Sequence, residues 1–268
     1  MYAKFDVKRN FCITARLNIT HFKKGANMPK LVVFSGAGLS AESGLATFRN
    51  SNGLWAQYDP MEVCNYENWL DNFALVHRFY NLRRQELAKV QPNAMHKYLA
   101  TLDKKLKSVE VIHITQNVDD LLERAGARNI MHIHGELTKL ICPQCQHVTN
   151  IGYNAYTPAP CEQCGYTKVK PKIIFFFEQA PLYAPMYEIL SSLSHNDMAL
   201  VIGTSGNVVD ISMLLTYAQR GGKRIGSKIL NNLAPSKSIT ESVFDKIFYK
   251  PTTEAIADID KEILAFFN

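Results

Sequence analysis

The sequence predicts an α/β fold, in which a doubly wound parallel sheet carries a small inserted domain and a helical insertion. Three observations predict it. Short apolar runs alternate along the chain with segments of helical periodicity, as in sheets whose parallel strands are joined by helices. A glycine turn, Gly36-Ala37-Gly38, follows the first apolar run. Two Cys-x-x-Cys pairs interrupt the alternation in the middle of the chain.

Each predicted element rests on its local pattern. The first strand is expected at Lys30–Ser35, whose central residues are all apolar, and residues 38–45 are expected to turn into a short helix. Residues 61–90 carry apolar side chains at helical spacing, and Pro92 then stops the helix. Further strands are expected at 109–114, 129–133, 172–177, 198–202 and 224–230. Further helices are expected at 94–106, 186–194, 211–220 and 253–267, and one more helix is expected to follow residue 120 and end at Ala125.

The glycine turn predicts a dinucleotide site of the Rossmann type. Gly36, Gly38 and Ala41 fit the G-x-G-x-x-G/A pattern between a strand and a helix. Glycine lets the backbone approach a pyrophosphate at a helix N-terminus. Residues 47–55 are loop-like, whereas a dehydrogenase would have a second strand ending in an acid. We therefore expect a dinucleotide cofactor without hydride transfer. A tight turn that binds no ligand is the alternative.

Polar clusters follow three of the predicted strands, at residues 36–40, 116–119 and 203–205. The carboxyl ends of parallel strands meet at one edge of a sheet, and ligands of open α/β sheets bind at that edge. The three clusters therefore predict a single site, built from segments that are far apart in the sequence.

Four of the six cysteines form the pattern C-x2-C-x15-C-x2-C, namely Cys142, Cys145, Cys161 and Cys164. This spacing is typical of structural zinc sites, in which four thiolates surround the ion. Such a site contributes about 10–16 kcal/mol to the folding of a segment too small to fold alone. Two redox-active pairs are the alternative. We expect one structural Zn²⁺ ion and reduced cysteines, which favour an intracellular compartment.

Length and charge exclude several classes of protein. The 268 residues, 47% of them hydrophobic, can bury a full core, and no apolar run approaches the length of a membrane span. The formal net charge of +6 comes without a run of like charges, so we expect no stable nucleic-acid partner and no membrane. Residues 1–27 carry six Lys or Arg against one Asp, and could be an organelle presequence, the product of an upstream start codon or an additional element.

Five motifs together resemble the sirtuins, NAD-dependent protein-lysine deacylases. They are GAGLSAESGLATFR, TQNVDDL, HIHGEL, the double Cys-x-x-Cys and VIGTSGNV, in this order over residues 30–267. The resemblance implies NAD as cofactor, acylated-lysine proteins as substrates and His134 as the catalytic base. It assigns to the cofactor site Gly36, Ala37, Gly38, Ser40, Glu42, Phe48, Arg49, Trp55, Gln116, Asn117, Asp119, Gly203, Thr204, Ser205 and Asn232.

The implied chemistry suits these residue types. Expulsion of nicotinamide from NAD leaves an oxocarbenium-like ribose, which the acyl-lysine carbonyl oxygen attacks, and water then releases free lysine and O-acyl-ADP-ribose. A neutral imidazole near pH 7 is suited to take the proton of a ribose hydroxyl. His132 lies on the same face of the predicted strand and competes for this role, but the His-Gly pair of the family motif selects His134.

Tyr80 and Arg83 bear on the acyl group. They stand three residues apart on the predicted helix and share a face, so that a phenol and a guanidinium could bind one carboxylate. The arrangement resembles class III sirtuins, which remove succinyl and malonyl as well as acetyl groups. A surface arginine beside a core tyrosine is the alternative. Phe177 stands where the family has a glycine beside the substrate backbone, which affects peptide affinity or sequence preference.

The resemblance implies a catalytic domain over residues 28–268, with the zinc module near 138–172 and the helical insertion near 56–92. Residues 1–27 are an extension of uncertain role. We expect a monomer in the cytoplasm, or in the mitochondrion if residues 1–27 are a presequence. Two other functions stay open: an NAD-sensing or nucleic-acid-binding zinc and Rossmann module without turnover, and a mono-ADP-ribosyltransferase that uses the same NAD site and His134.

Overall fold

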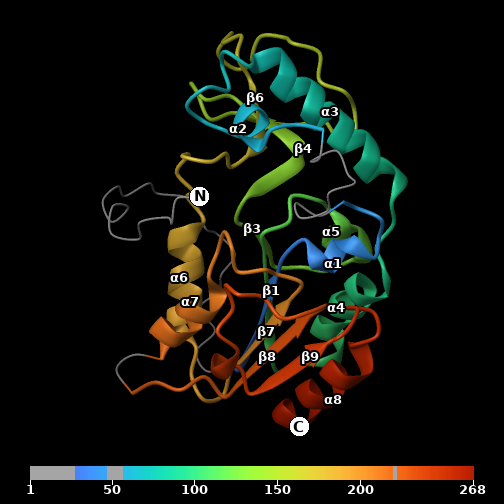
Figure 1. Cartoon of the computed structure of the whole chain (residues 1–268), viewed down its shortest axis with the longest axis vertical. Helices are drawn as coiled ribbons and strands as arrows, with labels where there is room; N and C mark the ends of the chain where they lie inside the picture. The colour runs from blue at the N-terminus through green and yellow to red at the C-terminus, as the bar shows by residue number, and fades with distance from the viewer. Residues whose placement is uncertain (1–27, 47–56, 220–221) are drawn as a thin grey trace.

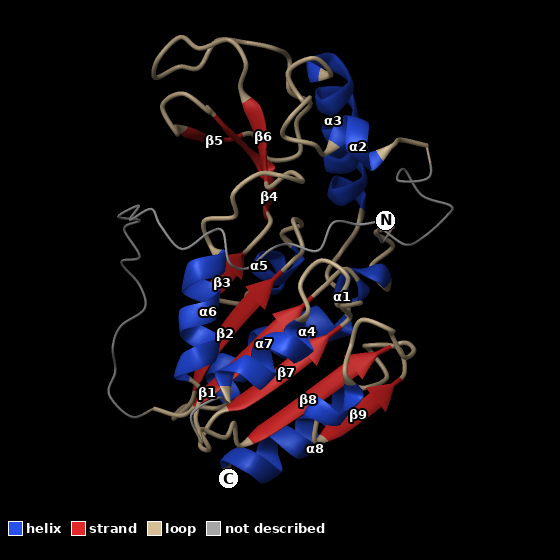
Figure 2. Ribbon diagram, turned by 60° about the vertical axis from the view of Figure 1, so that its left-hand side comes forward, coloured by secondary structure: helices blue, strands red, loops and turns tan. Residues whose placement is uncertain are grey.

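A computed structural model describes residues 28–46, 57–219 and 222–268. Its larger part is a six-stranded sheet in the order β3-β2-β1-β7-β8-β9, and every pair of neighbouring strands is parallel (Figure 2). The strand order reverses direction beside β1, so β1 and β7 mark the switch point of a doubly wound sheet. The strands are β1 (Lys30–Ser35), β2 (Glu110–Thr115), β3 (Ile130–His132), β7 (Met198–Ile202), β8 (Ser227–Asn232) and β9 (Lys246–Tyr249).

Helices cover both faces of this sheet, and each face has its own core. Val32 and Phe34 of β1 pack into the core beneath two helices, α6 (Tyr183–Ser192) and α7 (Ile211–Ala218). Leu31 and Val33 point to the other face, where the core includes three helices: α4 (Ala94–Lys105), α5 (Leu121–Ala125) and α8 (Ile256–Phe267). Because side chains alternate between two buried faces, the central strands are apolar throughout rather than alternating.

A smaller lobe stands above the carboxyl edge of the sheet (Figure 1). It contains a three-stranded antiparallel sheet in the order β5-β4-β6, formed by β4 (Gly135–Ile141), β5 (Val148–Asn150) and β6 (Lys170–Ile173). Beside it lie α2 (Pro60–Val63) and α3 (Phe73–Lys89), whose apolar residues share a core with β4 and β6. The remaining helices are α1 (Gly38–Ala41) and the 3₁₀ turn η2 (Glu241–Val243).

The structure corrects two of the predicted elements. The helical stretch expected over 61–90 is two helices, α2 and α3, with turns between them. The strand expected at 172–177 is β6, which ends at Ile173 and pairs with β4 in the small sheet rather than in the parallel one. Three further strands, β4, β5 and β9, were not expected. All three are partly exposed, so they lack the continuous apolar run of a buried strand.

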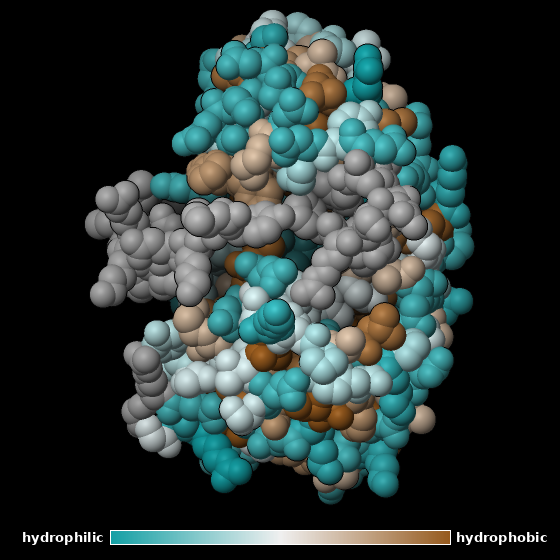
Figure 3. All heavy atoms as spheres, in the orientation of Figure 1, coloured by the Kyte–Doolittle hydropathy of each residue, from teal (hydrophilic) through white to brown (hydrophobic). Residues whose placement is uncertain are grey.

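Hydrophilic residues cover most of the described surface on the face shown in Figure 3. Tan to brown, more hydrophobic residues gather at the lower edge of the small lobe, where that lobe faces the sheet (Figure 3). Within the described residues, no helix is both long enough and apolar enough to cross a membrane.

Candidate functional site

Two glycine turns interlock at the carboxyl ends of β1 and β7. The backbone N–H of Gly36 donates to the carbonyl of Ile202 over 3.0 Å, and that of Gly38 donates to the carbonyl of Gly203 over 2.8 Å. A Cβ on Gly38 would lie 2.6 Å from Cα of Gly203, and a Cβ on Gly203 would lie 2.4 Å from the backbone nitrogen of Leu39.

This contact gives a different reason for glycine at these positions from the one that the sequence suggested. The sequence suggested that they bring backbone N–H groups close to a pyrophosphate. In the structure the N–H groups of Gly36 and Gly38 already donate to protein carbonyls, and the missing side chains let two turns touch. Gly203 also has φ +62°, which favours glycine by itself. The two turns in contact therefore form the base of the site, here called the floor, at the switch point of the sheet.

Amide and hydroxyl groups from four strand ends meet above this floor. The Ser40 hydroxyl donates to the Asp119 carboxylate over 2.9 Å and accepts from the Asn117 amide over 3.1 Å. The Gln116 amide donates to the Thr204 hydroxyl over 2.9 Å, and the Asn232 amide to the Thr204 carbonyl over 2.9 Å. The predicted clusters at 36–40, 116–119 and 203–205 thus come together at one edge. Such donors and acceptors suit the hydroxyls and carboxamide of a nicotinamide dinucleotide.

Asp119 is a half-buried acid within this network. Burial raises the pKa of its carboxyl, while hydrogen bonds from the Ser40 hydroxyl and the Leu121 backbone N–H act in the opposite direction. These two donors fix the carboxylate in one orientation. Asp119 therefore orients Ser40, and through Ser40 the side chain of Asn117.

His134 is a half-buried, neutral imidazole. Its Nδ1 lies 3.1 Å from the Gln116 carbonyl, which can only accept, so Nδ1 carries the proton. Its Nε2 is then an acceptor, 2.9 Å from the Tyr183 hydroxyl. Burial lowers the pKa of His134 to about 4, with the Gln116 hydrogen bond opposing the shift. An unprotonated nitrogen at pH 7 is the state that a general base requires.

The residue after His134 must be glycine. Gly135 has φ +91°, and a Cβ there would lie 2.1 Å from the carbonyl oxygen of Lys172. The His-Gly pair of the sequence therefore reflects the close approach of β4 to β6, which fixes the backbone beside His134.

His132 differs from His134 in every contact. Its Nδ1 lies 2.8 Å from the Asn117 carbonyl and its Nε2 lies 2.6 Å from the Glu123 carboxylate. Both partners are acceptors, so both ring nitrogens must donate and the ring is a cation. Burial by itself would lower the pKa of His132, but the hydrogen bond and charge of Glu123 outweigh it and the pKa is raised. A cation that uses both protons cannot act as a base, which favours His134 over its competitor.

The four predicted zinc ligands form one cluster in the small lobe. The sulfurs of Cys142, Cys145, Cys161 and Cys164 lie within 4.8 Å of one another. The distances are 3.6 Å from Cys142 to Cys164 and 3.7 Å from Cys145 to Cys161. Tetrahedral zinc with Zn–S bonds of about 2.3 Å separates its sulfurs by about 3.8 Å. The cluster therefore fits one structural Zn²⁺ ion.

Tyr80 and Arg83 come from the face of α3 that is turned toward β6. Tyr80 is 3% exposed, and its ring stacks on Phe175 with 5.8 Å between centroids. Its hydroxyl is buried near the Cys64 thiol, which is a weak acceptor, and it has no well-formed hydrogen bond among the described residues. Burial, followed by the nearby Cys64 thiol, raises the pKa of Tyr80. The side chain of Arg83 is mostly buried and pairs with Glu86 over 3.3 Å.

Some predicted site residues lie elsewhere or cannot be placed. Phe48, Arg49 and Trp55 are outside the described residues. The carboxylate of Glu42 accepts hydrogen bonds from the Thr252 and Thr253 side chains and from the backbone of Thr253, which ties α1 to the segment before α8. Its role in cofactor binding stays a prediction. Ala37 precedes α1, and the Ser205 carbonyl accepts a hydrogen bond from Ser236 over 2.6 Å.

Sequence reasoning missed Tyr183 and Glu123. Tyr183 reaches His134 from the start of α6, and Glu123 reaches His132 from α5. Neither residue belongs to a motif, and each lies in a helix whose apolar pattern suggests only packing. No signal in the sequence alone would have paired them with the histidines.

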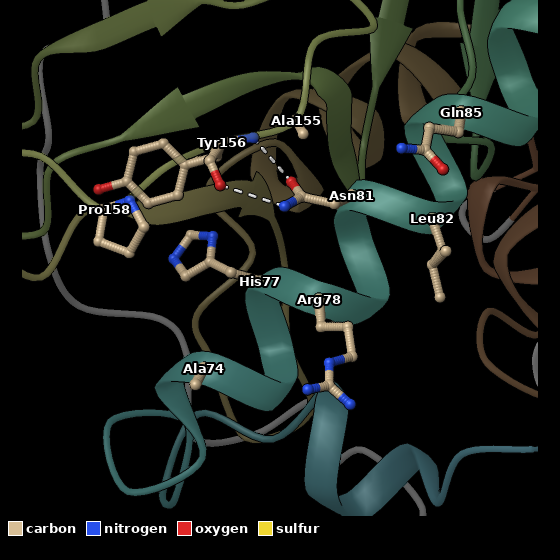
Figure 4. A pocket seen from close by; sticks show the side chains of 9 residues that line it. All are labelled: Ala74, His77, Arg78, Asn81, Leu82, Gln85, Ala155, Tyr156 and Pro158. Atoms are coloured by element: carbon tan, nitrogen blue, oxygen red, sulfur yellow. Dashed lines mark hydrogen bonds between the residues drawn. The ribbon is translucent and has the colours of Figure 1, made fainter.

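A separate cavity of about 360 Å³ lies on the outer side of α3 (Figure 4). Asn81 closes one side of it through two hydrogen bonds to the Tyr156 backbone. Helical spacing puts Arg83 on nearly the opposite side of α3 from the lining residues Ala74, Arg78 and Gln85. The cavity is therefore distinct from the site around His134.

Fold and site together define a class: a Rossmann-type dinucleotide-binding protein with a cysteine cluster that fits zinc in its small lobe and a neutral histidine after strand β3. Within this class the model of the Sir2 family matches residues 36–210. The chain is 66% identical over 254 residues to an NAD-dependent protein deacylase of Helicobacter hepaticus, covering 90% of this chain and 99% of that protein. It is 39% identical over 241 residues to one of Campylobacter jejuni, covering 90% and 98%.

Solved structures agree with these relatives. A Sir2 homologue in complex with NAD superposes with a TM-score of 0.74 at 30% identity, covering 89% of this chain and 91% of that chain. A mutant Sir2 homologue in complex with ADP-ribose also has a TM-score of 0.74 at 30% identity, covering 88% and 92%. The chain belongs to the Sir2 family.

Proposed function

We propose that this NAD-dependent protein deacylase of the Sir2 family removes acidic acyl groups, succinyl and malonyl, from lysine, and acetyl groups as well. The observation that carries the acyl preference is the buried Tyr80 hydroxyl, which has no well-formed hydrogen bond among the described residues. A buried hydroxyl without a well-formed hydrogen bond is costly, so a ligand that accepts its hydrogen bond gains affinity.

Arg83 supplies the charge that such a ligand needs. It follows Tyr80 by three residues in α3, and helical geometry brings the two side chains to one face. Arg83 forms an ion pair with the half-exposed Glu86 over 3.3 Å, and water can take the place of Arg83 around Glu86 at little cost. A terminal carboxylate could then accept from the Tyr80 hydroxyl and the Arg83 guanidinium, whereas an acetyl methyl offers neither an acceptor nor a charge.

His134 is the general base of the proposed reaction. NAD supplies the ribose that receives the acyl group. Nε2 of His134 carries no proton and accepts the hydrogen bond of the Tyr183 hydroxyl, so that taking a ribose hydroxyl proton requires this hydroxyl to turn away from the nitrogen. The hydrogen bonds that link Asp119, Ser40 and Asn117 fix these polar side chains within the cofactor site.

Nicotinamide release on matched peptides tests the proposal. Purified protein is given NAD with succinyl-lysine and acetyl-lysine versions of one peptide. We expect faster release with the succinyl peptide. Arg83→Met and Tyr80→Phe should each lower kcat/KM for the succinyl peptide about 10- to 100-fold, since each removes a hydrogen bond to a charged group. Both variants should leave acetyl-lysine turnover within about threefold.

Two controls make the result specific. Arg78→Met removes a similar charge from the far side of α3 and should change neither rate. His134→Ala should lose about 10²- to 10⁴-fold in kcat on both peptides. Preference for the acetyl peptide in the parent protein would reject the acidic-acyl proposal. Absence of release from both peptides, with NAD still bound, would favour an NAD-sensing role instead.

A further inference from the structure

Phe177 has an unusual backbone and an unusual exposure. Its φ of +66° lies in the left-handed region, which a bulky residue without a short polar side chain rarely adopts. Its side chain is 54% exposed, although the ring is large and apolar. Strained residues of this kind persist where the surrounding structure holds them, and they cluster at functional sites.

The segment that carries Phe177 is attached to His134 on both sides. Before Phe177, the backbone N–H of Ile174 donates to the His134 carbonyl over 2.9 Å. After it, the Tyr183 hydroxyl contacts Nε2 of His134 over 2.9 Å. Phe177 therefore lies within a short connection, from β6 to α6, whose two ends both contact the catalytic base.

The segment after α2 in the small lobe forms backbone hydrogen bonds with the same β6–α6 connection. The N–H of Phe176 donates to the Cys64 carbonyl over 2.9 Å, and the N–H of Tyr66 donates to the Phe176 carbonyl over 3.0 Å. Phe176 thus pairs like a strand with the segment after α2. Phe177 follows this pairing directly in the sequence.

A buried ion pair fixes the left-handed turn. The Glu178 carboxylate accepts from the Phe175 backbone N–H over 2.8 Å and from the Lys170 ammonium over 2.9 Å. The backbone N–H of Glu178 donates to the Phe175 carbonyl over 3.1 Å. These contacts involve the neighbours of Phe177 and not its ring, so a glycine would satisfy the turn without strain.

We propose that Phe177 is a specificity-determining residue, whose exposed ring contacts an apolar side chain of the substrate polypeptide next to the acyl-lysine. The described contacts of the turn do not use the ring, and its backbone is strained, while residues 174 and 183 on either side of it contact His134. An aliphatic or aromatic residue buries apolar surface against such a ring, and a small polar residue does not. This inference rests on the proposed function, because it needs a deacylase substrate.

The test compares Phe177→Gly with Gln146→Gly. Gln146 has φ +62°, is exposed and lies in the small lobe away from His134, so its replacement relieves the same kind of strain without touching the site. Both variants should raise Tm by about 1–4 °C. Only Phe177→Gly should raise KM, about 5- to 20-fold, for peptides with Leu or Phe beside the acyl-lysine, leaving Ser-flanked peptides within twofold. Phe177→Tyr should retain the preference.

Three outcomes would overturn the inference: an unchanged KM ratio between Leu- and Ser-flanked peptides, an equal loss on all peptides, or a lower Tm for Phe177→Gly. The anisotropy of labelled acetyl- and succinyl-lysine peptides with ADP-ribose present gives a readout without turnover. The Phe177 effect should be the same for both acyl groups there. If the acyl proposal fails, the ratio of the affinities for succinyl- and acetyl-lysine peptides would differ from the one expected. The preference for an apolar residue beside the acyl-lysine would remain.

Discussion

Two histidines of one His-x-His sequence have opposite protonation at neutral pH. His134 is neutral because it is half-buried and because one carbonyl and one hydroxyl are its hydrogen-bond partners. His132 is a cation because both its partners, the Asn117 carbonyl and the Glu123 carboxylate, only accept. His132 also holds the backbone of Asn117, whose side chain reaches Ser40. One histidine thus positions the loop beside the other.

Replacing Glu123 by Gln should make stability less dependent on pH. The pKa of His132 is raised in the folded protein, so its stabilising contribution is complete below about pH 6.5 and is lost as the pH rises through the folded pKa. Glu123 is 41% exposed, which limits the loss to about 1 kcal/mol or less. We expect urea unfolding to show this loss at pH 6 and much less of it at pH 9.

Glu262→Gln is the matched control for that experiment. Glu262 pairs with Lys246 over 3.6 Å, and lysine does not titrate between pH 6 and 9. Its effect on the free energy of unfolding should therefore be the same at both pH values. A loss for Glu123→Gln that stays constant from pH 6 to 9 would contradict a charged His132.

At the scale of elements, the site depends on contact between two turns. The turn after β1 and the turn after β7 touch through backbone atoms, with no side chain between them. Strand register sets this contact, because β1 and β7 pair in parallel from Leu31 with Met198 to Ser35 with Ile202. A side chain at Gly36, Gly38 or Gly203 would push the two strand ends apart.

Gly38→Ala should test this contact. The new Cβ would lie 2.6 Å from Cα of Gly203, and neither backbone can move without disturbing its strand. We expect a loss of about 2–3 kcal/mol in the free energy of unfolding, with weaker NAD binding by calorimetry. Gly165→Ala meets open space and strains only its own φ of +76°, so it should cost about 1–2 kcal/mol and leave NAD affinity unchanged. Equal NAD affinity in both variants would argue against the interlocked floor.

At the scale of the molecule, the two lobes are stabilised differently. The parallel sheet has extensive cores on both of its faces. The cysteine region of the small lobe has a core of only four buried residues, two of which are predicted zinc ligands: Leu140, Cys142, Cys161 and Val169. So little apolar surface cannot by itself offset the entropy of ordering the segment. We infer that the metal maintains this part of the fold.

Removing zinc should therefore open one lobe and spare the other. After chelation, or in Cys161→Ser, we expect proteolysis between residues 142 and 169 while the sheet keeps its circular dichroism signal. Deacylation should fall, because the same lobe carries α3 and the segment beside His134. Cys64→Ser is the control: Cys64 is outside the cluster, so zinc content should stay at one ion per chain. Simultaneous unfolding of both lobes would contradict this division.

Much of the sheet could be predicted because its strands are buried on both faces. β1 and β7 have the predicted bounds, since each is a continuous apolar run. The sequences of β4, β5 and β9 contain no continuous apolar run, because these strands are partly exposed. The strand expected to reach 177 ends at Ile173, because β4 begins at Gly135 opposite Ile173 and the chain beyond it pairs with Asn65 at Phe176.

The sequence by itself determined the class of fold, the zinc ligands and the segments that meet at the carboxyl edge. These follow from residue type and local spacing, which do not depend on the rest of the molecule. Only the tertiary structure decided which histidine is neutral, that the Tyr80 hydroxyl is buried without a well-formed hydrogen bond to any described residue, and that the Phe177 side chain is exposed. Burial and hydrogen-bond partners decide these properties, and the partners are distant in the sequence: Tyr183 for His134 and Lys170 for Glu178.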